Sequence, residues 1–360
     1  MLSMNRIFQM IIFLSVFLAV YFALNSYVVL KLASLLKYQN NAVILGLIIF
    51  FTAGFPLATL IERFIPNLIS RIFYTIASTW VGVMFLLFST LVVYEIIRFF
   101  IKIDPKIAGM TILIFVLIIS LISIINAFFV VVKDVEVPIT NLKEELSIVQ
   151  LSDIHIGTIR NSAFMNKVVE KTNKLDPDVV VITGDVVDAA SRLEPEMFSP
   201  FDKLRARVFF VTGNHETYEG IDNVYKLLDN SKIKILDNEV SSFDGIQIIG
   251  IEYSENKTHL KEKLSELNFD KNKPAILLYH SPSGMEYAKE YGIDLQLSGH
   301  THAGQIFPFT LLSRIFFPKV RGLYDLDGMY LYVSPGTGTW GPYMRLGSRN
   351  EITLLKLVKK

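Results

Sequence analysis

The segments RVFFVTGNHE, at residues 207–216, and DVVVITGD, at residues 178–185, share one pattern. Each starts with an apolar run of strand length and ends in glycine followed by side chains that can bind a metal ion. Short apolar runs bounded by turn residues are typical of strands buried inside a sheet. Because ligands bind at the carboxyl ends of strands in α/β sheets, we expect both segments to reach one site.

The same pattern extends over the C-terminal two thirds of the chain, where predicted strands alternate with segments of helical spacing such as residues 162–175. Such alternation is typical of an α/β domain. Besides 178–183 and 207–212, the predicted strands cover residues 147–151, 246–251, 275–279, 294–297, 329–333 and 352–357.

Five of the six histidines in the chain follow these predicted strands directly. A single histidine is more often structural than a ligand, but agreement among several strand ends favours a common site. An Asp-x-His and a His-x-His also have suitable geometry, because residues i and i+2 of an extended chain point to the same side. The candidate metal ligands are Asp153, His155, Asp185, Asn214, His280, His300 and His302, and His215 is a further candidate for the site.

The types of these side chains limit the chemistry. The chain has no cysteine, which excludes disulfides, thiolate nucleophiles and sulfur-ligated metals. Nitrogen and oxygen ligands without sulfur suit Mn²⁺, Fe or Zn²⁺. The candidates exceed the needs of one ion and indicate two ions that share a bridging carboxylate. A pair of ions suits phosphate-ester hydrolysis, because it lowers the pKa of a bridging water and stabilises charge on the phosphoryl oxygens.

The constellation resembles the calcineurin-like metallophosphoesterase family. The blocks that carry the resemblance are, in order, Asp153-Ile-His155, Gly184-Asp185, Gly213-Asn214-His215-Glu216, His280 and Gly299-His300-Thr301-His302. The segments QLSDIHIG at 150–157, LQLSGHTHAGQIFP at 295–308 and VSPGTGTWGPYMRLGSRNEITLLKL at 333–357 are similar to the membrane-anchored branch of that family. The resemblance covers residues 145–360 and implies an α/β/β/α metallophosphoesterase sandwich.

The resemblance also implies residue roles, with Asp185 as a ligand that bridges two metal ions. The implied ligands are Asp153, His155 and His302 for one ion and Asn214, His280 and His300 for the other. His215 would face the substrate phosphate, as acid to the leaving oxygen or as a transition-state donor, while a metal-bridging hydroxide attacks. Glu216 is expected to orient His215 or a loop, with a plain surface position as the alternative. Asn350 stands where this branch often has proline, and we expect no contact between Asn350 and the ligands.

The N-terminal third of the chain differs in composition. Residues 1–132 hold eight Lys/Arg and three Asp/Glu, against 27 and 31 in the remainder. Four uncharged stretches there have 23 to 26 residues each, and about 20 suffice for a helix to cross a bilayer. Core helices would show a polar stripe, and a cleaved signal peptide would not be followed by three more spans, so both alternatives are disfavoured. The predicted spans are residues 7–30, 38–61, 72–94 and 107–132.

We therefore expect a four-helix transmembrane anchor at 1–135, a short polar linker around 133–145, and a metallophosphoesterase domain at 145–360. Four spans put both chain ends on one side. An excess of Lys and Arg in the short loops marks the cytoplasmic side of a membrane protein. Here one side carries four and the other five, so their number does not determine the orientation. The group Arg98, Lys102 and Lys106 favours a cytoplasmic third loop, which would make the C-terminal domain of this multi-pass membrane protein extracytoplasmic.

The membrane part is interpreted as an anchor because the four stretches contain no ionisable group of the kind that transport sites use. Hydrogen bonds between helices would explain Asn25 and Asn126, the most polar side chains in these stretches.

The predicted function is that of a membrane-anchored phosphoesterase, and the alternative is a catalytically silent relative that serves as a scaffold or binding protein. The complete ligand set favours the enzyme. The apolar segment FPFTLLSRIFF at 307–317 follows His302 and is either buried core or a lip that holds a lipid or membrane-associated substrate. The expected partners are a phosphate-ester substrate and the lipid bilayer; a net charge of +1 argues against nucleic acid, and no protein partner is indicated.

Overall fold

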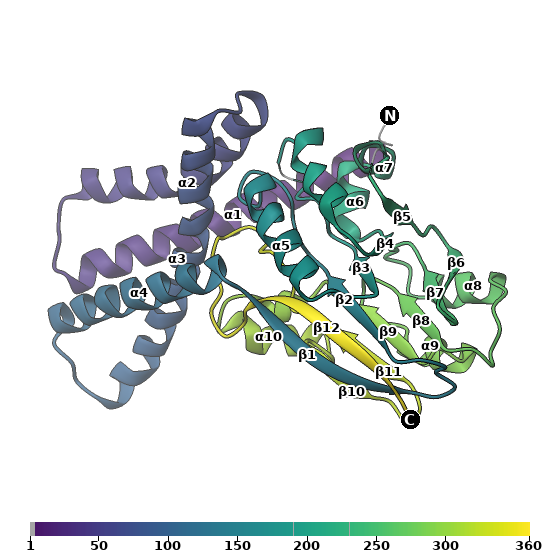
Figure 1. The fold of residues 1–360 in the computed structure, drawn as a ribbon. Helices are drawn as coiled ribbons and strands as arrows, with labels where there is room; N and C mark the ends of the chain where they lie inside the picture. The colour runs from purple at the N-terminus through teal and green to yellow at the C-terminus, as the bar shows by residue number, and fades with distance from the viewer. Residues whose placement is uncertain (1–3, 190, 230) are drawn as a thin grey trace. The chain divides into compact units, whose positions relative to one another are not determined.

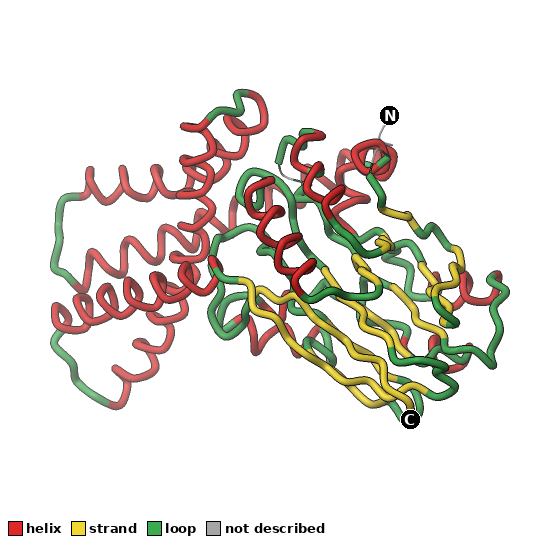
Figure 2. The backbone as a smooth tube through the Cα atoms, in the orientation of Figure 1, coloured by secondary structure: helices red, strands yellow, loops and turns green. Residues whose placement is uncertain are grey.

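The computed structural model describes residues 4–189, 191–229 and 231–360, and the chain divides into two compact units (Figure 1). The units are Met1–Ile122 and Ser123–Lys360. In the described residues, the first unit is helical and the second contains the strands (Figure 2).

Long apolar helices make up the first unit. They are α1 Met4–Leu35, α2 Asn41–Phe64, α3 Leu68–Phe100 and α4 Pro105–Phe128, the last of which ends in the second unit. Within the described residues, four helices are long and apolar enough to cross a membrane, which agrees with the predicted spans. Asn40 and Asn67 cap α2 and α3, because each side chain accepts backbone N–H groups that the first helical turn leaves free.

Asn25 links helices in the way expected from the sequence. Trp80 Nε1 of α3 donates to Asn25 Oδ1 of α1 over 3.1 Å. The Trp80 ring also stacks on Phe51 of α2, with ring centroids 3.8 Å apart. Asn25 and Trp80 therefore join three helices. The amide oxygen and the indole N–H form a hydrogen bond with each other, whereas lipid chains would offer neither of them a partner.

Two six-stranded sheets form the second unit (Figure 1). Their strand orders are β1-β12-β2-β3-β4-β5 and β10-β11-β9-β8-β7-β6, and both have parallel strands at their centre. The strands are β1 Val130–Ile139, β2 Leu146–Leu151, β3 Val179–Thr183, β4 Arg207–Val211, β5 Ile233–Ile235, β6 Glu239–Phe243, β7 Ile246–Gly250, β8 Ala275–Leu278, β9 Leu295–Ser298, β10 Gly322–Asp325, β11 Tyr330–Val333 and β12 Asn350–Lys359.

Clusters of buried side chains define the layers. One cluster joins the outer face of the first sheet to α5 Ser162–Lys174 and α7 Ile221–Leu228. A second cluster lies between the two sheets, and a third joins the second sheet to α8 His259–Glu266 and α9 Met285–Tyr291. The expected α/β/β/α sandwich is therefore confirmed.

The stretch predicted as a polar linker contains strand β1. Its ten residues pair in parallel with β12, from Val130 opposite Asn350 to Ile139 opposite Lys359. Val137 and Ile139 are buried, whereas Lys133, Asp134 and Glu136 are exposed at the edge of the sheet. The charges that suggested a linker are thus those of an edge strand, where charged side chains discourage pairing with another chain.

The C-terminal end of α4 is hydrogen-bonded to the rest of the second unit. Asn350 Nδ2 and Arg160 Nη2 both donate to the Ala127 carbonyl, over 2.7 and 2.9 Å. Both donors are buried. A helix leaves its last four carbonyls without intrahelical partners, and here side chains of the α/β domain satisfy one of them.

Arg345 extends this junction. Its backbone N–H donates to the Ser123 carbonyl, and its own carbonyl accepts from Asn126 Nδ2. Asn126 therefore bonds to a loop of the α/β domain, and the interpretation of Asn126 as a link between helices is wrong. The last residues of α4, from Ser123 on, are therefore part of the second unit.

Replacing Asn350 with leucine should lower the free energy of unfolding by about 1–3 kcal/mol, because Asn350 Oδ1 also accepts from Arg345 Nε over 2.9 Å and both partners would stay buried. Denaturant unfolding of the full chain in detergent measures the change. Asn272→Leu, at an exposed amide, is the control. Equal stability of the two variants would contradict the role given to this junction.

Candidate metal centre

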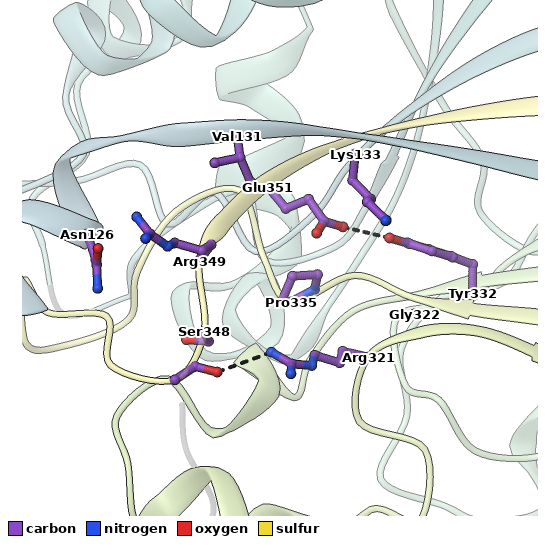
Figure 3. A pocket seen from close by; sticks show the side chains of 11 residues that line it. Asn126, Val131, Lys133, Arg321, Gly322, Tyr332, Pro335, Ser348, Arg349 and Glu351 are labelled. Atoms are coloured by element: carbon purple, nitrogen blue, oxygen red, sulfur yellow. Dashed lines mark hydrogen bonds between the residues drawn. The ribbon is translucent and has the colours of Figure 1, made fainter.

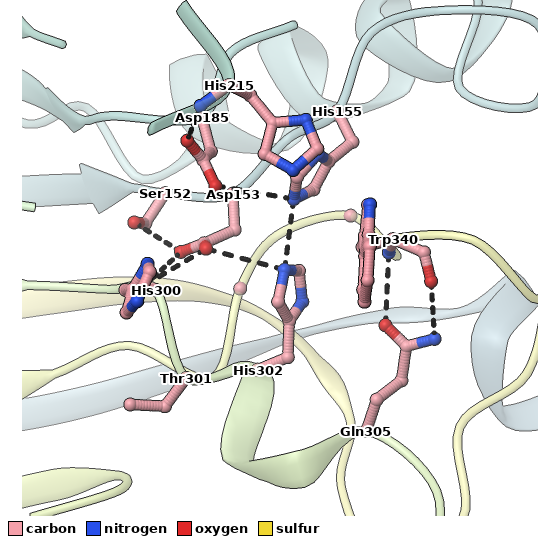
Figure 4. A network of polar contacts seen from close by, with 12 residues as sticks. Ser152, Asp153, His155, Asp185, His215, His300, Thr301, His302, Gln305 and Trp340 are labelled. Carbon is pink, nitrogen blue, oxygen red and sulfur yellow. Dashed lines mark hydrogen bonds and ion pairs between the residues drawn. The ribbon is translucent and has the colours of Figure 1, made fainter. Parts of the chain in front are cut away.

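Five strand ends from the two sheets meet at one site. Figure 4 shows the part of the site around Asp153, Asp185 and His300. β2, β3 and β4 of the first sheet lead into Asp153, Asp185 and Asn214, and β8 and β9 of the second lead into His280 and His300. All seven candidate ligands lie together there, His300 half-buried and the others buried. The sequence prediction that these residues converge agrees with this geometry.

One group of ligand atoms comes from Asp153, His155 and His302. The two histidine Nε2 atoms are 2.9 Å apart, and His302 Nε2 lies 3.4 Å from Asp153 Oδ1. The three ligand atoms lie within 4.8 Å of one another, which is close enough for a single ion to contact all three.

A second group lies beside the first. His280 Nε2 is 3.3 Å from Asp185 Oδ2, and His300 Nδ1 is 2.8 Å from Asn214 Oδ1. Asp185 Oδ2 is also 3.9 Å from His155 Nε2, so this carboxylate faces both groups. A carboxylate between two sets of nitrogen and oxygen ligands is the arrangement that a bridging ligand requires.

The backbone of the site adopts an uncommon conformation. A positive φ is uncommon outside glycine and costs about 1–3 kcal/mol at each residue, so it persists where the surroundings enforce it. The candidate ligands with φ between 48° and 72° are Asp153, His155, Asp185, His300 and His302. This conformation turns each side chain sharply at the end of its strand and toward the common centre.

Two glycines allow the carboxylates to sit in this crowded space. A Cβ on Gly299 would lie 2.2 Å from Asp153 Oδ2, and a Cβ on Gly213 would lie 2.2 Å from Asp185 Oδ1. Neither distance is possible between real atoms. The glycine before His300 and the one before Asn214 are therefore part of the site, since any side chain there would displace a carboxylate.

Glu216 holds two of the ligand loops from behind. Its carboxylate accepts the backbone N–H groups of Asp185, Val186, Val187 and Gly213, over 2.6 to 3.2 Å. Glu216 is fully buried at the start of α6 Asn214–Glu219. It therefore orients loops, one of the expected alternatives, and the surface alternative is wrong.

Arg345 supports His302 and was not anticipated from the sequence. Arg345 Nη1 donates to the His302 carbonyl over 2.9 Å, and Nη2 donates to the Gly338 carbonyl over 2.6 Å. The guanidinium is completely buried, and burial lowers its pKa to about 9, so it stays charged at neutral pH. The loop with His302 is thus fixed by a residue 43 positions later in the chain.

Three of the four candidate histidine ligands are neutral, as metal binding requires. Burial lowers the pKa of His155 and His302 well below the usual value and that of His300 to about 4, so these rings are neutral and offer lone pairs. Burial alone would lower the pKa of His280, but the Asp185 carboxylate raises it to about 10. Within the described residues, the buried His155 Nδ1 has no hydrogen-bond partner. The neutral nitrogens of His155, His300 and His302 and the two carboxylates form a donor set for divalent metal ions, and His280 would release a proton on binding one.

His215 lies next to the ligands and has a distinct environment. Its ring centroid is 4.6 Å from that of His155, and its Nδ1 accepts the Ala189 N–H over 3.4 Å. This contact leaves Nε2 as the ring nitrogen that is free to donate toward the site. The exposed rings of Tyr218 and Trp340 lie beside His215, with centroids 5.6 and 6.1 Å away.

Comparison with known proteins agrees with this geometry. A family model described as calcineurin-like phosphoesterase matches residues 146–304. An uncharacterized metallophosphoesterase of Aquifex aeolicus is 33% identical over 232 residues, which cover 60% of this chain and 86% of the Aquifex protein. The chain belongs to the calcineurin-like metallophosphoesterase family.

Other metallophosphoesterase relatives support the membrane-anchored branch. An uncharacterized metallophosphoesterase of Helicobacter pylori is 37% identical over 239 residues, 64% of each chain. A "Transmembrane protein with metallophosphoesterase domain" of Bos taurus is 37% identical over 253 residues, 63% of this chain and 56% of the bovine one. The chain thus spans less than two thirds of the length of these two relatives. Members of a metallophosphoesterase family use divalent metal ions, and the ligand cluster agrees with this.

Asp185→Asn should lose at least one metal ion and nearly all phosphoesterase turnover, because an amide supplies one neutral oxygen where the site offers a carboxylate to two groups of ligands. Metal analysis of the purified variant, together with its turnover, tests this. The matched control is Asp178→Asn, an exposed carboxylate just before β3. Two ions per chain with intact turnover in Asp185→Asn would remove Asp185 from the centre of the site.

Proposed function

We propose that the chain is a membrane-anchored phosphoric ester hydrolase with two divalent metal ions, Mn, Fe or Zn. The observation that carries the proposal is the Asp185 carboxylate, which faces two separate groups of nitrogen and oxygen ligands. One ion would be held by Asp153, His155 and His302, the other by Asn214, His280 and His300. When bound, such ions activate a water and neutralise charge on the phosphoryl oxygens.

The proposed catalytic residue of the chain itself is His215. An acid to the leaving oxygen would need a doubly protonated ring, whose Nδ1–H would point at the Ala189 N–H. The contact with Ala189 therefore favours the other role that the sequence left open, a neutral ring whose Nε2–H donates to a phosphoryl oxygen. A donor aimed at charge that develops in the transition state contributes without giving up its proton.

The alternative of a catalytically silent scaffold is less well supported. A scaffold has no need for five residues with positive φ, for buried carboxylates, or for the glycines that make room for them. Strain of this kind is retained where the site requires it.

A lipid or membrane-associated substrate is supported by the segment after His302. This segment contains helix α10 Phe309–Phe316, whose apolar side chains are 44–74% exposed. Such exposure does not fit the alternative that the segment is buried core. The helix sits against the ligand loop, because a Cβ on Gly304 would lie 2.6 Å from Thr310 Cα. At its end, the Phe317 ring is 5.3 Å from the ring of the ligand His300.

An exposed apolar helix beside a phosphate-binding centre suits an ester with an acyl chain. Burial of an acyl chain contributes about 0.8 kcal/mol per methylene, so α10 could select lipid esters over small soluble ones. Trp340 and Tyr218 add aromatic surface on the His215 side.

We further propose that the catalytic domain is extracytoplasmic, on the basis of the basic group Arg98, Lys102 and Lys106 in the third loop. Protease treatment of intact cells that carry a C-terminal tag tests this. Protection of the tag, lost on permeabilisation, would reverse the assignment.

His215→Ala should keep both metal ions but lower kcat by about 10²–10³-fold, the usual cost of removing a transition-state donor. The loss should be similar for an aryl phosphate with a good leaving group and an alkyl phosphate with a poor one, because the donated hydrogen bond is to a phosphoryl oxygen. Metal analysis and kcat on the two esters measure this. A loss confined to the alkyl ester would assign His215 as the acid instead.

Changing Ile315 and Phe316 to serine should lower kcat/KM for a lipid phosphate at least tenfold and leave a small soluble ester nearly unaffected. These two side chains are 74% and 70% exposed, so their loss removes surface for a lipid chain without opening the core. Leu323→Ser, an exposed apolar residue of β10, is the control. Equal losses on both esters, with a lower melting temperature, would end the lipid proposal and leave the hydrolase proposal standing.

A further inference from the structure

A second pocket in the α/β domain has no role in the proposed chemistry (Figure 3). Its volume is about 590 Å³, within the range of pockets that hold small ligands. None of its lining residues is a candidate metal ligand. Its polar lining includes Asn126, Lys133, Arg321, Tyr332, Arg349 and Glu351.

The lining of this pocket is basic. Lys133, Arg321 and Arg349 contribute three cations against the single carboxylate of Glu351. Among the residues that the structure describes, no carboxylate oxygen lies within 4 Å of a side-chain nitrogen of these three residues. Glu351 already accepts a hydrogen bond from the Tyr332 hydroxyl over 2.6 Å and another from Thr353. The pocket therefore keeps a net positive charge for a ligand.

The two arginines come from separate segments that are tied together. Arg321 Nη1 donates to the Gly347 carbonyl over 3.1 Å, which holds the segment before β10 against the loop before β12 (Figure 3). Ser348 in that loop is buried and donates to the Gln305 carbonyl over 2.9 Å. The two segments that carry Arg321 and Arg349 are thus held in place by these hydrogen bonds. A guanidinium group can donate two parallel hydrogen bonds to the oxygens of one phosphate.

The position of the pocket relates it to the bilayer. Asn126, on one side of the pocket, lies in the last turn of α4, a helix apolar and long enough to span a membrane. Phe128 and Phe129 come two and three residues later and are both more than half exposed. A spanning α4 would therefore put Asn126 at the level where the helix leaves the hydrocarbon, which is the level of lipid phosphates.

We propose that this pocket binds the phosphate of an anionic phospholipid headgroup, held by Arg321 and Arg349 with Lys133 at the opposite wall. Basic pockets at the end of membrane helices bind anionic lipids because their cationic side chains attract the negatively charged headgroups at the membrane surface. This binding is independent of hydrolysis, since it uses no residue of the metal centre.

The test uses the full chain in detergent, titrated by calorimetry with dioctanoyl phosphatidylglycerol, dioctanoyl phosphatidylcholine and inorganic phosphate. The phosphatidylglycerol should bind at least tenfold more tightly than the other two, and its affinity should fall as salt rises. Arg321→Ala with Arg349→Ala should weaken phosphatidylglycerol binding at least tenfold. Arg349→Ala alone, which keeps the bond from Arg321 to Gly347, should weaken it less.

The control is Arg205→Ala with Arg207→Ala, which removes two exposed arginines at the start of β4. This variant should bind phosphatidylglycerol like the unmodified chain. Equal binding by the pocket variants would assign the lipid to another site, including the metal centre, and overturn the proposal. Inorganic phosphate that binds as tightly as the lipid would make the ligand a soluble phosphate, and it would overturn the lipid assignment.

Discussion

The burial of two carboxylates among histidines is the constraint on which the rest of the domain depends. Asp153 and Asp185 are almost inaccessible to water, and a buried charge is costly unless opposite charge and hydrogen bonds compensate it. His280 supplies part of this compensation, and its pKa of about 10 reflects the field of Asp185. Asp153, whose pKa burial raises to about 6, also accepts the His300 N–H and the Ser152 hydroxyl. Divalent cations would balance the remaining charge.

This constraint explains features that lie outside the ligands themselves. Strands from both sheets must end at the same edge, and their last residues must turn through left-handed conformations to aim inward. Glu216 then fixes four backbone N–H groups behind the turns, and Arg345 fixes the His302 loop. The scaffold thus supplies the free energy that offsets local strain and orients the ligand loops.

The part of the fold that could be predicted from the sequence is the part with local patterns. Apolar runs such as 178–183 predicted the central strands, because both faces of those strands are buried and successive positions are therefore apolar. The residues that follow these runs predicted the candidate site. Strand β1 was missed because its exposed charges resemble a linker and its partner β12 lies more than 200 residues away. Arg345 was missed for the same reason: its contact with His302 joins distant segments and leaves no periodic signal. Asn350 was noticed as unusual, yet its bond to Ala127 depends on the folded arrangement.

The junction at the end of α4 has a consequence for where the chain can be divided. A soluble domain is ordinarily obtained by cutting a membrane protein in the linker after its last span. Here, carbonyl groups near the end of that span accept hydrogen bonds from buried groups of the α/β domain. A chain that starts at Val130 would leave Asn350 Nδ2 and Arg160 Nη2 without the Ala127 carbonyl, and the Arg345 N–H without that of Ser123. Since Arg345 also holds His302, the damage would spread from the cut toward the metal centre. A shortened chain that keeps these bonds therefore has to include the last turn of α4, and its water solubility would depend on changing the exposed apolar side chains of that turn, such as Ile125 and Phe128.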